Sequence, residues 1–143
     1  MGHVSSTLTV AAPREKVWEV ITDPAGYDKW LAIHTKWKTE PPAPLAVGAQ
    51  MTEVVTMLGM ANTISWTVEE LDAPARLVIG GTGMAGVRTT FTFAVEEGAD
   101  GCEVRAEAEF TGQMIVGALG KAVEKDAVVN LDKSLQALAG LVA

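Results

Sequence analysis

The chain has 143 residues, of which 48% are apolar and 20% are charged, and it carries a formal net charge of −7 at pH 7. This length suits a single domain, residues 1–143, with a core of its own. The acidic balance argues against binding to nucleic acid or to anionic lipid heads, because both are themselves negatively charged.

Features that would place the chain in a membrane or an oxidising compartment are not found in the sequence. No cationic segment followed by an apolar run opens the chain, and no apolar stretch approaches the roughly 18 residues of a membrane span. Cys102 is the single cysteine, so an internal disulfide cannot form, which suits a reducing compartment. We therefore expect a cytoplasmic protein, either a monomer or a homodimer, without membrane insertion.

The first thirty residues predict one strand and two short helices. Apolar and polar residues alternate over 4–10, which indicates a strand. Pro13 suits the first turn of a helix, and Pro24 disfavours helix at the residue before it, so this helix ends there. A second short helix is predicted through Tyr27 and Trp30.

The middle of the chain predicts antiparallel strands joined by turns. Period-two alternation marks the strands, and Gly, Pro and Asp mark the turns. The predicted strands are a weak one over 34–40 and clearer ones over 51–57, 64–68, 77–79, 87–95 and 102–110. The predicted turns lie at 58–59, 72–74 and 97–101.

The last strand and the segment after it determine the predicted architecture. Over 102–110, apolar residues alternate with Glu and Arg, so one face of the sheet is dry and the other is wet. From about Val116 to Leu141 the period becomes helical, with an apolar stripe that includes Leu119 and Leu141. A helix of this length spans roughly 40 Å, and we expect it along the concave side of the sheet, giving an α+β domain.

The opening of the chain carries a recognisable pattern, Val17-Trp-x-x-Ile-Thr-Asp-Pro-x-x-Tyr-x-x-Trp30. This pattern and the order of elements resemble the START/Bet v 1-like helix-grip (SRPBCC) superfamily, in its polyketide cyclase/dehydrase-like branch. The resemblance implies a curved seven-stranded antiparallel sheet wrapped around the C-terminal helix, with two short helices after the first strand. It also implies an apolar ligand cavity between sheet and helix, but no single reaction, because this fold hosts many functions.

Two charged or titratable residues are candidates for chemistry in that cavity. Strand parity places Glu53 on the apolar side, where it is either buried and paired or neutral, as suits a general base, or exposed through strand curvature or an edge position. His34 precedes a strand near the expected cavity opening and either donates a proton to a ligand or packs there. His3 is far from His34 in sequence, and no metal-binding spacing occurs, so neither a metal site nor a cofactor is expected.

Two polar residues lie within the apolar stripe of the long helix. Asn130 and Ser134 are four residues apart and therefore project from one face. They either orient a ligand by hydrogen bonds, or the serine bonds back to its own helix and the asparagine reaches a strand carbonyl.

A third pattern, Gly81-x-Gly83-x-x-Gly86, matches a dinucleotide-binding motif in letters only. That motif requires a helix after the glycines, whereas a strand is predicted here, so we expect a hairpin with Met84 near the cavity mouth. The residues expected to line the ligand site are Trp30, His34, Met51, Glu53, Val55, Met57, Trp66, Met84, Phe91, Phe93, Val123, Ala127, Asn130 and Ser134.

Three functional hypotheses follow. The leading one is binding of a small apolar or amphipathic molecule in the cavity. The second is a cyclase/dehydrase-like enzyme that moves protons with Glu53 and His34, although few other polarising groups are expected in the interior. The third is a toxin-like partner in a toxin–antitoxin pair, because some actinobacterial proteins that resemble this chain carry that description.

Overall fold

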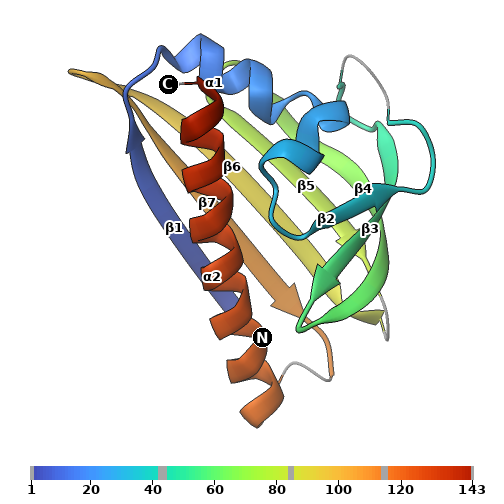
Figure 1. Ribbon diagram of the computed structural model, residues 1–143. Coiled ribbons are helices and arrows are strands. Elements are labelled where there is room, and N and C mark those ends of the chain that lie inside the picture. The colour runs from blue at the N-terminus through green and yellow to red at the C-terminus, as the bar shows by residue number, and fades with distance from the viewer. Residues whose placement is uncertain (1, 42–44, 84–85, 114–115, 143) are drawn as a thin grey trace.

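A computed structural model of the chain describes residues 2–41, 45–83, 86–113 and 116–142. Within these ranges, seven strands form one antiparallel sheet in the order β1-β7-β6-β5-β4-β3-β2 (Figure 1). The elements are β1 (Gly2–Val10), α1 (Arg14–Ile21), the 3-10 helix η1 (Pro24–Lys29), β2 (His34–Trp37), β3 (Gln50–Met57), β4 (Met60–Asp72), β5 (Arg76–Thr82), β6 (Arg88–Gly98), β7 (Gly101–Thr111) and α2 (Gly117–Val142). The helix-grip α+β architecture predicted from the sequence is confirmed.

Several predicted boundaries were wrong. β1 begins at Gly2, and β4 extends over Met60–Asp72, well beyond the predicted 64–68. The second short helix is present as a 3-10 helix and ends at Lys29, one residue before Trp30. The weak strand stops at Trp37, after a register shift that follows His34.

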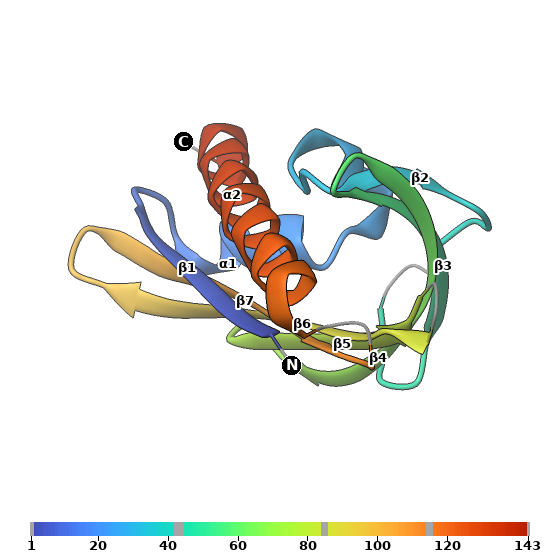
Figure 2. The same ribbon diagram turned by 90° about the horizontal axis from the view of Figure 1, so that it is seen from below.

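The sheet is strongly curved, and α2 lies along its concave side (Figure 2). The helix runs over β1 at one edge of the sheet, where Ser6 of β1 donates a hydrogen bond to Asp132 of α2. One face of α2 is buried, comprising Gly120, Val123, Ala127, Leu131, Ser134, Leu135, Leu138 and Val142. Leu119 and Leu141, which the sequence placed in the apolar stripe, are instead about 40% exposed (40% and 42%), because they lie at the margin of this face.

On the inward face of the sheet, small residues of β7 lie beside large residues of β6. Its apolar residues are buried and its charged residues point outward, as predicted. Ala106 lies opposite Phe93 of β6, and Ala108 lies opposite Phe91. Each small residue therefore stands beside a large one, so the space that the alanines leave is shared with the two phenylalanine rings.

Turn chemistry accounts for the tight hairpin between β3 and β4. Leu58 and Gly59 both have positive φ, 53° and 73°, which is the geometry of a two-residue turn that matches the twist of antiparallel strands. Residues 58–59 are the turn predicted from the sequence. None of the helices in the described ranges has the length and apolar character needed to cross a bilayer.

Candidate functional site

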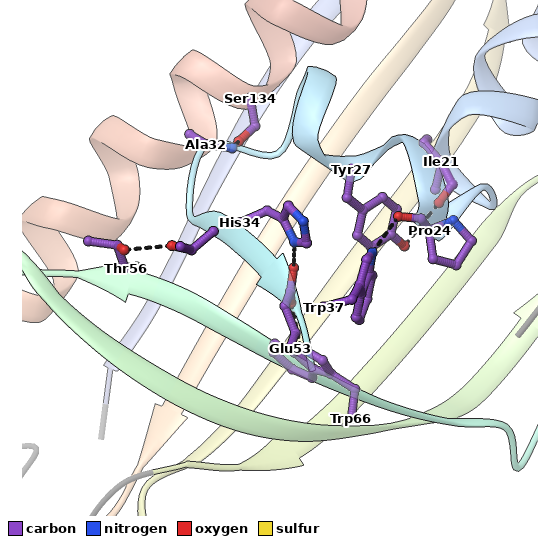
Figure 3. A network of polar contacts seen from close by, with 11 residues as sticks. Ile21, Pro24, Tyr27, Ala32, His34, Trp37, Glu53, Thr56, Trp66 and Ser134 are labelled. Carbon is purple, nitrogen blue, oxygen red and sulfur yellow. Dashed lines mark hydrogen bonds and ion pairs between the residues drawn. The ribbon is translucent and has the colours of Figure 1, made fainter. Parts of the chain in front are cut away.

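Three polar side chains from neighbouring strands meet on the concave wall of the sheet (Figure 3). Trp66 of β4 donates its indole N–H to Oε1 of Glu53 at 2.7 Å, and Nδ1 of His34 pairs with Oε2. His34 lies opposite Val55 in the β2–β3 register, and Trp66 lies opposite Met51 in the β3–β4 register. Both side chains therefore reach Glu53 diagonally from the strands on either side of β3.

This His34–Glu53–Trp66 network is buried. The side chains of His34 and Glu53 are 4% and 1% exposed. Of the two alternatives for Glu53, the structure shows the buried and paired one, and exposure at an edge was wrong. A buried ionisable pair is costly to desolvate unless its hydrogen bonds are made, and here both carboxylate oxygens have partners.

Aromatic rings surround the imidazole of His34. Its ring centroid lies 5.2 Å from that of Trp37 and 6.4 Å from that of Tyr27. The Trp37 indole donates to the carbonyl of Pro24 at 2.8 Å, and the Tyr27 hydroxyl donates to the carbonyl of Ile21 at 3.1 Å. The first bond fixes β2 to η1 and the second fixes η1 to α1, so the position of His34 is set by its surroundings.

The pKa of the Tyr27 phenol is shifted by its surroundings. Burial raises the pKa of its phenol strongly, and the negative charges of Glu53 and Asp23 raise it further. The phenol is therefore neutral and serves as a hydrogen-bond donor throughout the physiological range.

On α2, the two polar residues singled out from the sequence take structural partners. Ser134 donates to the carbonyl of Asn130 at 2.7 Å and accepts the backbone N–H of Ala32 at 2.9 Å. The serine thus bonds back to its own helix, as one alternative held, but Asn130 does not reach a strand carbonyl: its amide donates to Asp126 at 3.1 Å. Asp126 also accepts the backbone N–H of Leu58 at 3.1 Å.

The sequence did not point to Asp126 or Ala32. Asp126 is one of several acidic residues on a helix, and only the tertiary position of the β3–β4 turn gives it a partner. Ala32 takes part through its backbone, which leaves no signal in a side-chain pattern.

The other residues expected to line a ligand site fall into two groups. One group is sealed from water, with at most 3% of the residue surface exposed, and consists of Trp30, Met51, Val55, Trp66, Phe91 and Phe93. Val123 and Ala127 are also buried, whereas Met57 and Asn130 are half-buried. Met84 lies outside the described residues. Of the residues expected to line a ligand site, Met57 and Asn130 therefore touch solvent, whereas the sealed group does not.

Two surface depressions lie away from this lining. One, of about 290 Å³, is bordered by residues of α1, of η1, of the link between them and of the end of α2, among them Asp23 and Leu141. The other, of about 200 Å³, is bordered by Trp18 and Leu71, among others. None of the residues predicted to line a ligand site borders either depression.

The remaining motifs assemble no further site in the described ranges. The glycine pattern that begins at Gly81 is followed by the strand β6, and Cys102 is buried, which raises the pKa of its thiol. Among the described residues, no group of three or more His, Cys, Asp or Glu is placed to hold a metal ion.

Comparison with known proteins decides the family. The family described as "Polyketide cyclase / dehydrase and lipid transport" matches residues 1–143. The chain belongs to this family. The resemblance to polyketide cyclase/dehydrase-like helix-grip proteins that the opening pattern carried is therefore confirmed.

Curated relatives and solved structures resemble the chain over nearly its whole length. Two Mycobacterium tuberculosis proteins are each 28% identical to the chain: "Uncharacterized protein Rv1546" over 99% of both chains, and "Toxin Rv0910" over 95% of this chain and 94% of its own. A START superfamily protein from Mycobacterium smegmatis has a TM-score of 0.80 at 19% identity, covering 99% of this chain and 97% of its own. The Zhui aromatase/cyclase from Streptomyces sp. R1128 has a TM-score of 0.76 at 23% identity, covering 98% and 92%. At these identities the two structures show a shared fold.

Proposed function

We propose that the chain binds a small apolar or amphipathic molecule on the concave side of the sheet, beneath α2. The observation that carries this proposal is the His34–Glu53–Trp66 network, in which polar groups from three strands converge on one point of an otherwise apolar wall. A mostly apolar surface with a few convergent polar groups is the usual composition of a small-molecule site. An apolar pair at these positions would be cheaper to bury, so retaining an ionisable one suits recognition of a polar group.

The half-buried residues indicate where such a ligand enters. Met57 ends β3, and Asn130 lies on the α2 flank that Asp126 ties to the β3–β4 turn. A ligand entering between this turn and α2 meets Met57 and Asn130 first and the polar network further inside. Its apolar body supplies most of the affinity, at roughly 25 cal/mol per Å² of apolar surface buried, before the costs of binding.

Binding is tested with a neutral fluorescent probe, N-phenyl-1-naphthylamine, on two variants of the same helix. Val123→Phe adds bulk to a buried residue that faces the sheet, whereas Val129→Phe adds the same group at a position that is 45% exposed. We expect the wild type and Val129→Phe to bind the probe equally, and Val123→Phe to weaken binding about tenfold, as expected for a loss of about 1.4 kcal/mol. Absence of probe binding, or equal weakening by both variants, contradicts the proposal. Circular dichroism of each variant checks that the fold is kept.

A second candidate function is proton transfer to a ligand held in the same place, as in a cyclase or dehydrase. Both oxygens of Glu53 are occupied, so in this reaction Glu53 positions His34 and the imidazole transfers the proton. Substitution of Glu53 by Gln distinguishes the two functions, with native mass spectrometry identifying any small molecule that copurifies from the protein's own host. An enzyme loses turnover and keeps its ligand, whereas a binding protein changes only in affinity.

The 28% identity to "Toxin Rv0910" adds a third candidate, a toxin-like role. It is tested by inducing the chain in its host and following growth. Growth arrest that is relieved by coexpression of a neighbouring small gene supports this role, and unimpaired growth at high expression contradicts it.

A further inference from the structure

Trp30 carries a hydrogen-bond donor that the described part of the protein does not use. The residue is 2% exposed, and its indole Nε1 is buried without a hydrogen-bond partner in the described residues. The indole or phenol donors of three residues in this region have partners: Tyr27 donates to Ile21, Trp37 to Pro24 and Trp66 to Glu53. Among these four aromatic residues, Trp30 is therefore the one whose hydrogen-bond donor has no partner in the described residues.

The surroundings of Trp30 place this donor in the interior. Its ring packs edge to face with Tyr27, at a centroid distance of 5.4 Å, and with Phe93 on the concave wall, at 5.5 Å. Two residues further along, the backbone N–H of Ala32 is fixed to Ser134 of α2. Trp30 thus lies where η1 meets both the sheet and the helix.

Leaving this N–H unpaired costs free energy. A buried donor without a partner destabilises a protein, and native structures pair nearly all such groups. A contact between an N–H and an aromatic ring compensates only weakly. Because the group is buried from bulk solvent, a stronger partner has to enter the interior, either as part of a ligand or as a trapped water molecule.

We propose that Nε1 of Trp30 donates a hydrogen bond to an oxygen atom of the bound ligand. This inference rests on the proposed binding function and adds the chemical class of the ligand: an apolar body that bears an uncharged oxygen acceptor, such as a ketone, ester or ether. An anionic group is disfavoured, because burying a charge against a neutral indole donor costs more free energy than burying an uncharged oxygen. A donor that is buried and unpaired discriminates well, since the protein cannot satisfy it unless the ligand does.

The test uses two probes of the same shape, 2-acetylnaphthalene and 2-isopropylnaphthalene, which differ in the ketone oxygen. Calorimetric titration of the wild type should show the ketone binding more tightly than the hydrocarbon. Trp30→Phe keeps an aromatic ring and removes the donor, so the ketone should lose about tenfold in affinity, as for one hydrogen bond, and the hydrocarbon should change little. Trp37→Phe is the matched control, because that indole already has the carbonyl of Pro24; its effect on the two probes should be equal.

Each outcome decides the matter. If neither probe binds the wild type, both the binding function and this inference fail. If both bind but Trp30→Phe weakens them equally, binding stands and the donor role fails, as it would if a trapped water or an aromatic face held the N–H. Should Trp30→Phe not fold, the indole N–H signals of the wild-type protein give the answer: the Trp30 proton should move downfield with the ketone and not with the hydrocarbon, and no such difference overturns the proposal.

Discussion

Nε1 of Trp66 donates to Oε1 of Glu53 at 2.7 Å, and the second oxygen of the same carboxylate is paired with His34. The carboxyl group of Glu53 on β3 thus pairs with a buried polar atom on each neighbouring strand. Removing Glu53 leaves two polar groups without a partner, whereas changing its charge alone does not. Loss of the whole side chain and loss of its charge alone should therefore lower the free energy of unfolding by different amounts.

Glu53→Ala should lower the free energy of unfolding by about 3–5 kcal/mol, because a buried network loses its central partner. Glu53→Gln should cost about 1–2 kcal/mol, since its amide oxygen still accepts from Trp66. Urea denaturation measures both. Glu96→Ala, at an exposed position of β6, is the control and should change stability by less than about 0.5 kcal/mol. Equal losses for Glu53→Ala and Glu53→Gln would show that the charge, and not the hydrogen bonding, matters.

Raising the pH should destabilise the protein through Tyr27, its only tyrosine. The folded state keeps the phenol proton, whereas the unfolded chain releases it above about pH 10. The unfolded state therefore binds fewer protons there, and the free energy of unfolding falls as the pH rises. Absorbance at 295 nm should stay flat above pH 10 until the protein unfolds. Tyr27→Phe should remove this pH-dependent part, and a tyrosinate signal from folded protein would contradict the burial.

Gly101 is the residue at which a side chain should be least tolerated. A Cβ there would lie 2.1 Å from the carbonyl oxygen of Val10, and its φ is +141°. Gly101→Ala should therefore cost about 3 kcal/mol or more, or prevent folding. Gly140→Ala, on α2 with no atom within 4 Å of the new Cβ, should gain up to about 1 kcal/mol from helix propensity. Thermal denaturation of both variants tests this contrast, which fails if Gly101→Ala is neutral.

Asp126→Ala should loosen the β3–β4 turn without unfolding the protein. The carboxylate accepts N–H groups from both Leu58 and Asn130. Its loss should speed amide hydrogen exchange at Leu58 about tenfold, the effect of one hydrogen bond to a charged group. Asp132→Ala removes the contact with Ser6 on the opposite edge of the sheet and should leave exchange at Leu58 unchanged. If both variants act alike, the effect comes from helix charge and not from the bond.

The fold could be predicted from the sequence because its signals are local. Alternation in β7, the helical period of α2 and the prolines around α1 each follow from neighbouring residues. Parity placed Glu53 on the inner face for the same reason, since successive strand residues point to opposite sides.

What closes on Glu53 could not be predicted in this way. His34 and Trp66 are brought to Glu53 by strand register, and register depends on the whole sheet. Ser134 and Asp126 accept hydrogen bonds from the backbone N–H groups of Ala32 and Leu58. Nearly every residue has a backbone N–H group, so the residue types at these positions do not indicate the contacts. The unpaired indole of Trp30 is likewise a property of packing, and a tryptophan in the opening pattern gives no sign of it.

The strand order has a consequence for how the chain reaches this structure. Strands β2 to β7 are neighbours in sequence and pair in succession, but β1 pairs with β7, so that Gly2 faces Phe110. Because β1 is synthesised long before its partner β7, its hydrogen bonds can form only after about a hundred further residues have been added. Such distant contacts slow folding, and until then nine residues of strand-forming, nearly uncharged sequence have no partner. We expect newly made chains to depend on protection of this segment during synthesis.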